Sequence, residues 1–389
     1  MKERKRHQLT FQVLSPIVSV FLKIRFNYVF DDLSKVEGPY LLLANHNLEL
    51  DPALVGVAAG RHLYFVASEH LMRKGIATKL LMYFFKPIIH MKGRQGVQTV
   101  KQMIRTLKNG HSVCIFPEGD RSFNGLTGPM LPTIGRVARC SGAKLVTYRI
   151  EGGYFAQPRW SLTLRRGRLR GRLVREYSVE ELKKMTDEQV NSAICEDLYE
   201  DAYETQSRDR IAFRGKNLAL GLETMLFRCP HCGRISTLHS EKNRLYCDCG
   251  FNAVYDVYGD LTDQNGKKYT VTELDREQRE ELPKSIAVYS GEKPFFSDLV
   301  TMYEIDERHN IRREVSGTLA AFGEWIECCG RRVNYDQIQG MAIYSRNSVI
   351  LHIAGEDGHI EIKSDKMFCG LKYLYLYKIK EKQMQTGKM

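Results

Sequence analysis

A histidine and an aspartate five residues apart follow a short apolar run near the N-terminus. The segment 44–56 reads ANHNLELDPALVG and places His46 and Asp51 directly after the run YLLL. A histidine can take a proton near neutral pH, and a carboxylate on its far ring nitrogen fixes the tautomer and stabilises the imidazolium. Because five residues leave room for a turn that returns Asp51 to His46, the spacing predicts a general base that activates a weak nucleophile.

The same spacing occurs twice in the chain, so it is not specific by itself. His352 and Asp357 repeat it in HIAGED, and a motif this short often matches by chance. The first pair has more support, because Asn45 precedes it and Asp51 can be the N-cap of a helix with proline at N1. A second polar cluster, FPEGDRS at 116–122, follows another apolar run. Since α/β sheets collect active sites at strand ends, we favour the first pair.

The clusters NHNLELD and FPEGDRS together resemble the paired signatures of the glycerolipid acyltransferase family, whose members acylate lysophosphatidic acid. The resemblance extends over residues 10–205. It implies a membrane-associated acyltransferase that moves a fatty acyl group from acyl-CoA or acyl-carrier protein to a lysophospholipid acceptor, giving phosphatidic acid. His46 would be the catalytic base and Asp51 its orienting carboxylate. The residues expected to bind substrate are Asn45, Glu118, Gly119, Arg121, Ser122 and Arg94.

Arg121 offers a planar fork to the acceptor's phosphate, and three positions near the motifs depart from the family's pattern. Asp120 stands where the family usually has threonine, and its charge is unfavourable beside a phosphate unless it pairs with Arg121. Thr147 stands where the family usually has proline, and the arginine of its second block is matched by either Lys92 or Arg94. These departures concern the acceptor more than the reaction. Glycerol-3-phosphate or another lysolipid therefore remains an alternative acceptor.

Glu118 cannot attract an anion, so we expect it to position Arg121 or a substrate hydroxyl. Glu49, the second carboxylate of the first motif, is expected to be solvated.

Four of the ten cysteines form a cluster with the spacing of a metal site. They are Cys229, Cys232, Cys247 and Cys249, and a glycine follows each pair. Four thiolates in two pairs suit a tetrahedral structural Zn²⁺. His239 is an alternative ligand, whereas His231 is crowded between two cysteines. A closed four-cysteine site leaves no open coordination position, so we predict a structural role for it.

The composition points to an anionic partner. The chain has 389 residues, 43% of them apolar, and a formal net charge of +12, which predicts two or three domains and attraction to headgroups, phosphorylated substrates or nucleic acid. A nucleic-acid-binding zinc ribbon is the less favoured alternative, since it leaves both polar motifs without a role. The clustered cysteines favour a reducing compartment. We therefore place the protein in the cytoplasm, peripheral on the inner face of the cell membrane.

Residues 1–25 combine basic and apolar side chains. They could form a basic amphipathic segment on an anionic membrane surface, or a helix that covers the core and ends in a frayed tail. Ser15, Pro16 and Lys23 interrupt the apolar stretch, so we predict no spanning helix. No cleavage site of a signal peptide follows.

Short apolar runs alternate with helical patterns over residues 39–175. The expected strands are 40–45, 63–68, 87–91, 112–117 and 144–150. This alternation predicts an α/β domain with a mixed sheet flanked by helices. Strand-like patterns from 298 to 364 and a helical end resemble a pleckstrin-homology-like domain by their order. The expected domains are 1–210 (acyltransferase), 211–260 (zinc-ribbon-like), 261–297 (linker) and 298–389 (β-rich, ending in a helix).

Overall fold

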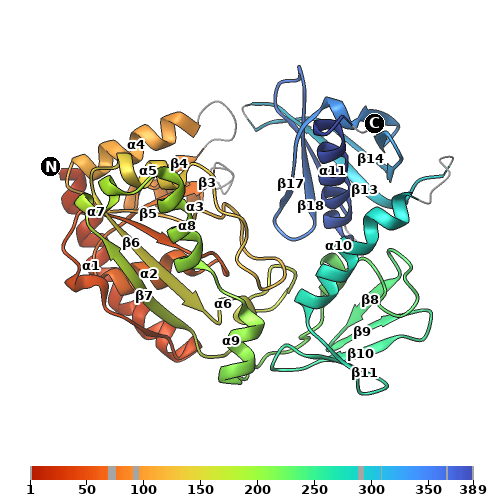
Figure 1. Ribbon diagram of the computed structural model, residues 1–389, viewed down its shortest axis with the longest axis horizontal. Helices are drawn as coiled ribbons and strands as arrows, with labels where there is room; N and C mark the ends of the chain where they lie inside the picture. The colour runs from red at the N-terminus through yellow and green to blue at the C-terminus, as the bar shows by residue number, and fades with distance from the viewer. Residues whose placement is uncertain are drawn as a thin grey trace. The chain divides into compact units, whose positions relative to one another are not determined.

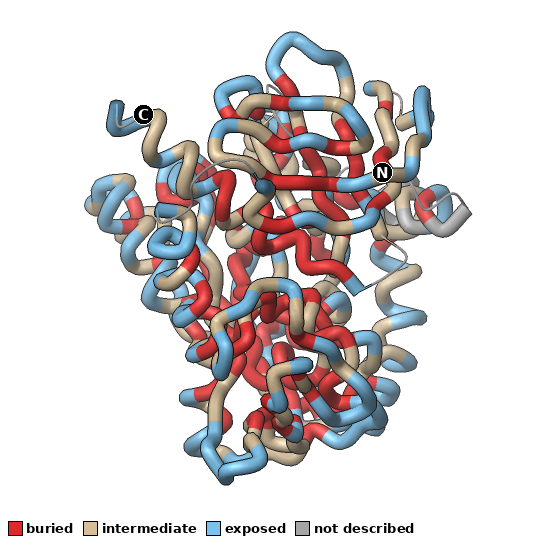
Figure 2. The backbone as a smooth tube through the Cα atoms, turned by 90° about the vertical axis from the view of Figure 1, so that its right-hand side faces the viewer, coloured by how far each residue is buried: buried red, intermediate tan, exposed pale blue. Residues whose placement is uncertain are grey.

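The chain divides into two compact units. The computed structural model describes residues 2–68, 76–90, 96–287, 293–307, 309–364 and 367–387. Unit 1 comprises Met1–Pro158 and Leu164–Arg214, and unit 2 comprises Arg159–Thr163 and Gly215–Met389. Buried residues concentrate in the strands and in the helix faces that cover them (Figure 2). The two units are described separately below.

Unit 1 contains a seven-stranded mixed sheet in the order β1-β7-β6-β2-β5-β3-β4 (Figure 1). The strands are β1 (Val29–Phe30), β2 (Tyr40–Ala44), β3 (Tyr64–Ser68), β4 (Ile88–His90), β5 (Val113–Ile115), β6 (Lys144–Glu151) and β7 (Arg170–Tyr177). All neighbours pair in parallel except β6 and β7. The predicted α/β class is thus confirmed for this part of the chain. Because β2 lies between β5 and β6, the segments that follow these three strands meet at one edge of the sheet.

Helices cover both faces of this sheet. They are α1 (Lys2–Phe26), α2 (Asp51–Ala59), α3 (Ile76–Phe84), α4 (Gly96–Lys108), α5 (Ile134–Cys140), α6 (Gly153–Ala156), α7 (Val179–Lys184), α8 (Asp187–Leu198) and α9 (Ala202–Asp209), with the 3-10 turn η1 (Leu33–Lys35). Apolar side chains of α4, α5, α7 and α8 pack on β2, β5 and β6 in one buried cluster. On the opposite face, α1 packs on α2, and α2 packs on β7.

Local sequence signals account for several helix boundaries. Ser178 and Glu181 form a capping box at the start of α7, in which each side chain accepts a hydrogen bond from the other residue's backbone N–H. After α4, Gly110 has a φ of 78°, a conformation that glycine adopts without steric cost. Its N–H donates to the carbonyl of Leu107, as expected for a helix end.

Helix α1 is continuous through Pro16 and carries two different faces. Its inner face buries His7, Leu22 and Phe26. Its outer face exposes an apolar stripe, defined by Leu9, Val13, Ile17, Val20 and Ile24, each more than half exposed. The part Arg6–Phe26 is long and apolar enough to cross a membrane by length and composition alone. Ser15 and Pro16 do not interrupt the helix, contrary to what the sequence suggested, but length and composition alone leave the prediction of no spanning helix untested.

Unit 2 begins with a small antiparallel sheet in the order β12-β11-β10-β9-β8. Its elements are the 3-10 turn η3 (Leu222–Thr224), β8 (Leu238–Glu241), β9 (Arg244–Cys247), β10 (Asn252–Tyr255), β11 (Leu261–Asp263) and β12 (Lys268–Tyr269), followed by α10 (Val271–Ala287). The segment 261–297, predicted as a linker, therefore contains two strands, a long helix and the start of the next sheet.

The rest of unit 2 is a seven-stranded antiparallel sheet in the order β16-β15-β14-β13-β19-β18-β17. The elements are β13 (Phe296–Ile305), β14 (Ile311–Ala321), β15 (Trp325–Cys328), β16 (Arg331–Asn334), η4 (Tyr335–Gln337), β17 (Ile338–Tyr344), β18 (Ser348–Ile353), β19 (His359–Lys363) and α11 (Gly370–Gln385). Helix α11 packs on β17 and β18, and Tyr373 and Tyr377 donate hydrogen bonds to the carbonyls of Leu319 and Ile338. Strands ending in one helix follow the predicted order. The pleckstrin-homology-like assignment stays a prediction.

Candidate active site and candidate metal centre

His46 and Asp51 lie in contact just beyond the carboxyl end of β2. The distance from His46 Nδ1 to Asp51 Oδ2 is 2.8 Å. The His46 side chain is 23% exposed, whereas Asp51 is fully buried. The imidazole stacks on Phe116 with ring centroids 4.6 Å apart. An ionised Asp51 accepts the Nδ1 proton, and this leaves the lone pair of Nε2 free to take a proton from a ligand.

Asp51 does not have the N-cap role predicted from the sequence. It is the first residue of α2, and the residue in the N-cap position is Leu50. Its Oδ2 accepts hydrogen bonds from the backbone N–H groups of Asn47 (2.6 Å) and Leu48 (3.0 Å) as well as from the imidazole. The carboxylate therefore folds the loop between β2 and α2 back on itself, and this is what brings it to the ring.

The second motif holds the backbone of His46 from both sides. The N–H of His46 donates to Glu118 Oε1 at 2.6 Å, and its carbonyl accepts from the N–H of Ser122 at 2.9 Å. The register of β2 and β5, which pairs Leu43 with Ile115, brings the two loops together. The two predicted motifs thus meet in one place.

Glu118 contacts backbone amides rather than Arg121. Its second carboxylate oxygen, Oε2, accepts from the N–H of Gly128 at 2.6 Å. Burial raises the pKa of Glu118 to about 8, although the two N–H donors oppose the shift. The expectation that Glu118 positions Arg121 is not met. Its observed contacts join the loop 45–48 to the segment after the second motif.

Asn45 and Ser122, predicted to bind substrate, are both buried. The side-chain amide of Asn45 donates to the carbonyl of Ile150 and to Glu200 Oε2, and its oxygen accepts from the N–H of Ile150. The hydroxyl of Ser122 donates to the carbonyl of Leu126 and accepts from a backbone N–H. Their polar groups are therefore engaged within the protein, and their contacts are those of positioning residues.

Glu200 is a buried carboxylate that sequence reasoning missed. It follows α8, and its Oε2 accepts from the side-chain amides of Asn45 at 3.1 Å and Asn47 at 2.6 Å. Its Oε1 accepts from the N–H of Gly152 at 3.3 Å. Burial raises the pKa of Glu200 to about 8. Asn47 was also missed, although it lies within the first motif. Glu200 carries no local signal, because Asn45 and Asn47 lie more than 150 residues earlier in the chain and Gly152 lies 48 residues earlier.

Arg121 lies beside the first motif and is mostly buried. The exposed fraction of its side chain is 15%, and its Nη2 lies 3.3 Å from Glu49 Oε1. Glu49 is two-thirds exposed, as expected of a solvated carboxylate, and it also pairs with Arg121. Burial lowers the pKa of Arg121, and the carboxylates of Glu49, Asp51 and Asp120 oppose that shift. An arginine can exchange an exposed carboxylate partner such as Glu49 for a phosphate.

Gly119 has a φ of 73° and makes the turn that aims the second motif at His46. No atom lies within 4 Å of a Cβ added there, so glycine is required by the left-handed backbone. Arg94 and Lys92, the two candidates for the family's second block, lie outside the described residues. His352 lies on β18 in unit 2, where its ring is 5.6 Å from that of His359.

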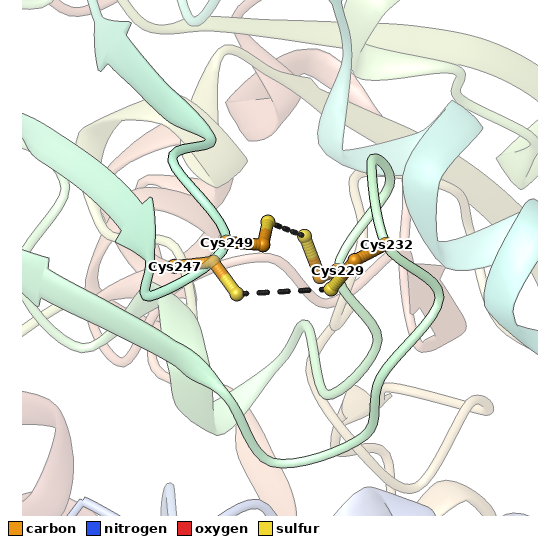
Figure 3. Close-up of side chains that lie close together, drawn as sticks. All are labelled: Cys229, Cys232, Cys247 and Cys249. Atoms are coloured by element: carbon orange, nitrogen blue, oxygen red, sulfur yellow. Dashed lines mark hydrogen bonds between the residues drawn. The ribbon is translucent and has the colours of Figure 1, made fainter.

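The four predicted cysteines come together in unit 2, as Figure 3 shows. Cys229 Sγ lies 3.7 Å from Cys249 Sγ, and Cys232 Sγ lies 3.9 Å from Cys247 Sγ. Tetrahedral Zn²⁺ with bonds of about 2.3 Å places its sulfur ligands about 3.8 Å apart. Gly233 and Gly250 have φ values of 73° and 94°, which turn the chain sharply after each pair. The donor set and its dimensions therefore fit a tetrahedral metal ion.

One comparison with known proteins covers both motifs. Residues 25–151 match the family model described as Acyltransferase. One similar solved structure is the 1-acyl-sn-glycerophosphate (LPA) acyltransferase PlsC from Thermotoga maritima, at 18% identity and a TM-score of 0.44, covering 51% of this chain and 80% of that chain. None of the curated proteins matches this sequence. Residues 25–151, which carry both motifs, are thus an acyltransferase-family domain.

Proposed function

We propose that this chain is a membrane-associated acyltransferase that moves a fatty acyl group from acyl-CoA or acyl-carrier protein to the hydroxyl of lysophosphatidic acid, giving phosphatidic acid. The observation that carries the proposal is the contact between His46 Nδ1 and Asp51 Oδ2, with the imidazole partly exposed beside the second motif. The family match over residues 25–151 supports the reaction class. The acceptor and the donor are taken from the resemblance of the two motifs.

The reaction needs one base and no nucleophile from the protein. His46 Nε2 removes the proton of the acceptor hydroxyl as the oxygen attacks the carbonyl carbon of the thioester. The negative charge of Asp51 stabilises the imidazolium that forms. When the tetrahedral intermediate collapses, the bond from carbon to sulfur breaks, and the leaving thiolate takes the proton from His46. The base is then restored for the next turnover.

Arg121 is proposed to bind the phosphate of the acceptor. It lies in the loop that also holds the backbone of His46, so a phosphate on Arg121 would place the acceptor's hydroxyl near the base. Glu49 would leave Arg121 when the phosphate arrives, because two anions cannot share one guanidinium without repulsion. Gly119 leaves open space beside this site. Other acceptors that carry a phosphate, including glycerol-3-phosphate, fit the same arrangement.

The apolar stripe of α1 is proposed to lie in the membrane interface. Five large apolar side chains at helical spacing are more than half exposed on one face, which is unusual on a surface that meets only water. The inner face of the same helix packs on α2. A helix held in this way can bury its stripe among acyl chains while it stays on its unit, and substrates would then reach the site from the bilayer.

The four cysteines are proposed to hold one structural Zn²⁺. All four positions would be filled by protein ligands, so the ion would stabilise the fold of the small sheet and leave no open position for a substrate. The cysteines and His46 belong to different units. We therefore assign the metal no part in acyl transfer.

Acyl transfer by the full chain tests the proposed function. Labelled acyl-CoA and acyl-carrier protein are each offered with a panel of lysolipids in vesicles, and the products are separated. We expect phosphatidic acid from lysophosphatidic acid. His46→Ala should lower turnover by at least ~10²-fold with an unchanged circular dichroism spectrum.

His352→Ala is the matched control, because it belongs to the second occurrence of the same spacing and lies in the other unit. It should remain fully active. Transfer to none of the lysolipids, or an active His46→Ala variant, would overturn the proposal.

A further inference from the structure

A polar cavity lies in unit 1 where β2, β3 and β5 begin, at the opposite ends of the strands from the candidate active site. Its volume is about 250 Å³. It is lined by residues that precede or begin β2, β3 and β5, whereas His46 and the second motif follow the other ends of β2 and β5. A strand of five residues spans about 16 Å. A molecule in this cavity would therefore not contact His46.

Every polar side chain of this cavity can donate a hydrogen bond, and the part of its lining that the structure describes includes no carboxylate. The polar members are Gln8, Arg61, His62, Tyr64, His111 and Ser112. Arg61 donates through Nη2 to the carbonyl of Ser34 at 2.7 Å, and its guanidinium lies 5.6 Å from the ring centroid of Tyr40. Among the residues described here, Arg61 forms no ion pair with a carboxylate. Most of its five N–H donors thus remain available for an anion.

The histidines at the cavity are crowded together. The ring of His62 lies 5.5 Å from that of His7, and the ring of His111 lies 5.3 Å from that of Tyr64. His62 Nε2 donates to the carbonyl of Phe85 at 3.2 Å. Burial and the neighbouring His7 lower the pKa of His62 to about 4, so the imidazole stays neutral beside its neighbours.

The cavity borders the apolar stripe of α1. Gln8 lines the cavity, and the stripe begins at the next residue, Leu9. Leu80 and Tyr83 of the neighbouring helix α3 are also about half exposed, and Arg6 of α1 donates to the carbonyl of Tyr83 at 3.2 Å. A cavity with a cationic side chain and several hydrogen-bond donors thus lies beside an exposed apolar surface. A phospholipid has the complementary arrangement, with an anionic headgroup joined to apolar acyl chains.

We propose that this cavity binds the phosphate of an anionic membrane phospholipid whose acyl chains lie along the apolar stripe of α1. The lipid bound there would be neither donor nor acceptor, since the site is remote from His46. It would instead fix α1 and unit 1 on anionic bilayers. This inference rests on the proposed membrane contact of α1 and is independent of the chemistry at His46.

Vesicle binding by the full chain tests this proposal. The fraction of protein that sediments is measured with phosphatidylcholine vesicles and with vesicles that also contain phosphatidylglycerol. We expect tighter binding to the anionic vesicles. Arg61→Gln should lower the ratio of the affinities for anionic and neutral vesicles by at least about tenfold, because a charge-assisted hydrogen bond is lost. His111→Gln is a second variant in case Arg61→Gln does not fold, and it should weaken the same preference.

The matched control is Arg208→Gln, which removes an equal charge from an exposed side chain of α9. It should keep most of the preference. Ile17→Ser should weaken binding to both kinds of vesicle, which tests the membrane contact of α1 separately. His46→Ala should bind as the wild type does, so failure of the proposed reaction can be distinguished from failure of this site.

Three results would overturn the proposal. One is equal binding of the wild type to the two kinds of vesicle. Another is an equal loss of the preference for anionic vesicles in Arg61→Gln and Arg208→Gln. That result would indicate a general electrostatic attraction between the basic protein and the vesicle surface. The third comes from inorganic phosphate alone. If it raises the melting temperature of the wild type but not of Arg61→Gln, and the vesicles show no preference, the cavity binds a free anion rather than a lipid.

Discussion

Replacing Asp51 with asparagine isolates the charge at the proposed base from its geometry. Oδ2 of Asp51 accepts from the imidazole and from two backbone N–H groups. Oδ1 is buried and has no hydrogen-bond partner among the described residues. The amide oxygen of asparagine should take the Oδ2 position, because its NH₂ group there would face two N–H donors. The NH₂ group then takes the buried Oδ1 position, which costs about 1–3 kcal/mol of stability.

The expected loss of rate follows from the distance between the two charged groups. With 2.8 Å between Nδ1 of His46 and Oδ2 of Asp51, the centres of charge are about 4 Å apart in the imidazolium state. At an effective dielectric constant of about 20 their attraction is about 4 kcal/mol. Asparagine keeps the hydrogen bond and loses this attraction. Since about 1.4 kcal/mol corresponds to a tenfold change in rate, kcat should fall by up to about 10³-fold.

The assay is acyl transfer at saturating lysophosphatidic acid and acyl-CoA, with the melting temperature recorded for each variant. Asp51→Asn should be slow at every pH, while the KM values of both substrates change little, because Asp51 is buried and does not contact them. A variant that folds and retains more than about a third of wild-type kcat would refute the reasoning, since a loss of attraction that small is far below the Coulomb estimate.

The other predictions concern the phosphate site, the metal centre and the buried carboxylates. Arg121→Ala should raise the KM for lysophosphatidic acid more than that for acyl-CoA, and an equal rise in both would argue against its role. Purified protein should contain about one zinc per chain, and Cys229→Ser should lose it with new proteolytic cleavage near the small sheet, whereas metal-free wild type prepared under reducing conditions would contradict the site. The free energy of unfolding should fall as pH rises from the ordinary glutamate value of 4.5 to about 8, because Glu118 and Glu200 keep their protons in the folded state only. Glu200→Gln should make this pH dependence shallower in denaturant titrations, and an unchanged slope would show that Glu200 is ionised when folded.

The contact between His46 and Asp51 could be predicted from the sequence because it is local. Five residues after a strand can only form a tight loop, and an acceptor at its end satisfies the loop's own amides. The N-cap prediction for Asp51 was wrong for the same reason. The free N–H groups of Asn47 and Leu48 precede the helix, and they compete successfully for the carboxylate. The sequence alone could not decide which backbone N–H groups would donate to the Asp51 carboxylate.

The buried network around the loop could not be predicted, since its members are far apart in sequence. Glu200 has the surroundings of a solvated residue in a charged region, and only the pairing of β2 with β6 brings Asn45 to the carbonyl of Ile150 and to Glu200. Glu118 was expected to position Arg121 or a substrate hydroxyl, because it cannot attract an anion. The chain turns at Gly119, so their side chains go to different partners.

The carboxylates around the loop 45–48 explain how a turn without regular structure can hold a base in place. The successive N–H groups of His46, Asn47 and Leu48 each donate to a side-chain carboxyl oxygen, the first to Glu118 and the other two to Asp51. Glu200 fixes the side chains on either side of the histidine. In the proposed reaction, proton transfer requires the base to remain within hydrogen-bond reach of the acceptor hydroxyl. The fixed backbone restricts the positions that the His46 imidazole can adopt. Arg121 differs, because its acidic partner Glu49 is on the surface and two-thirds exposed. In the proposed reaction, the loop would thus combine a firmly held base with an arginine whose surface partner can be exchanged for the substrate's phosphate.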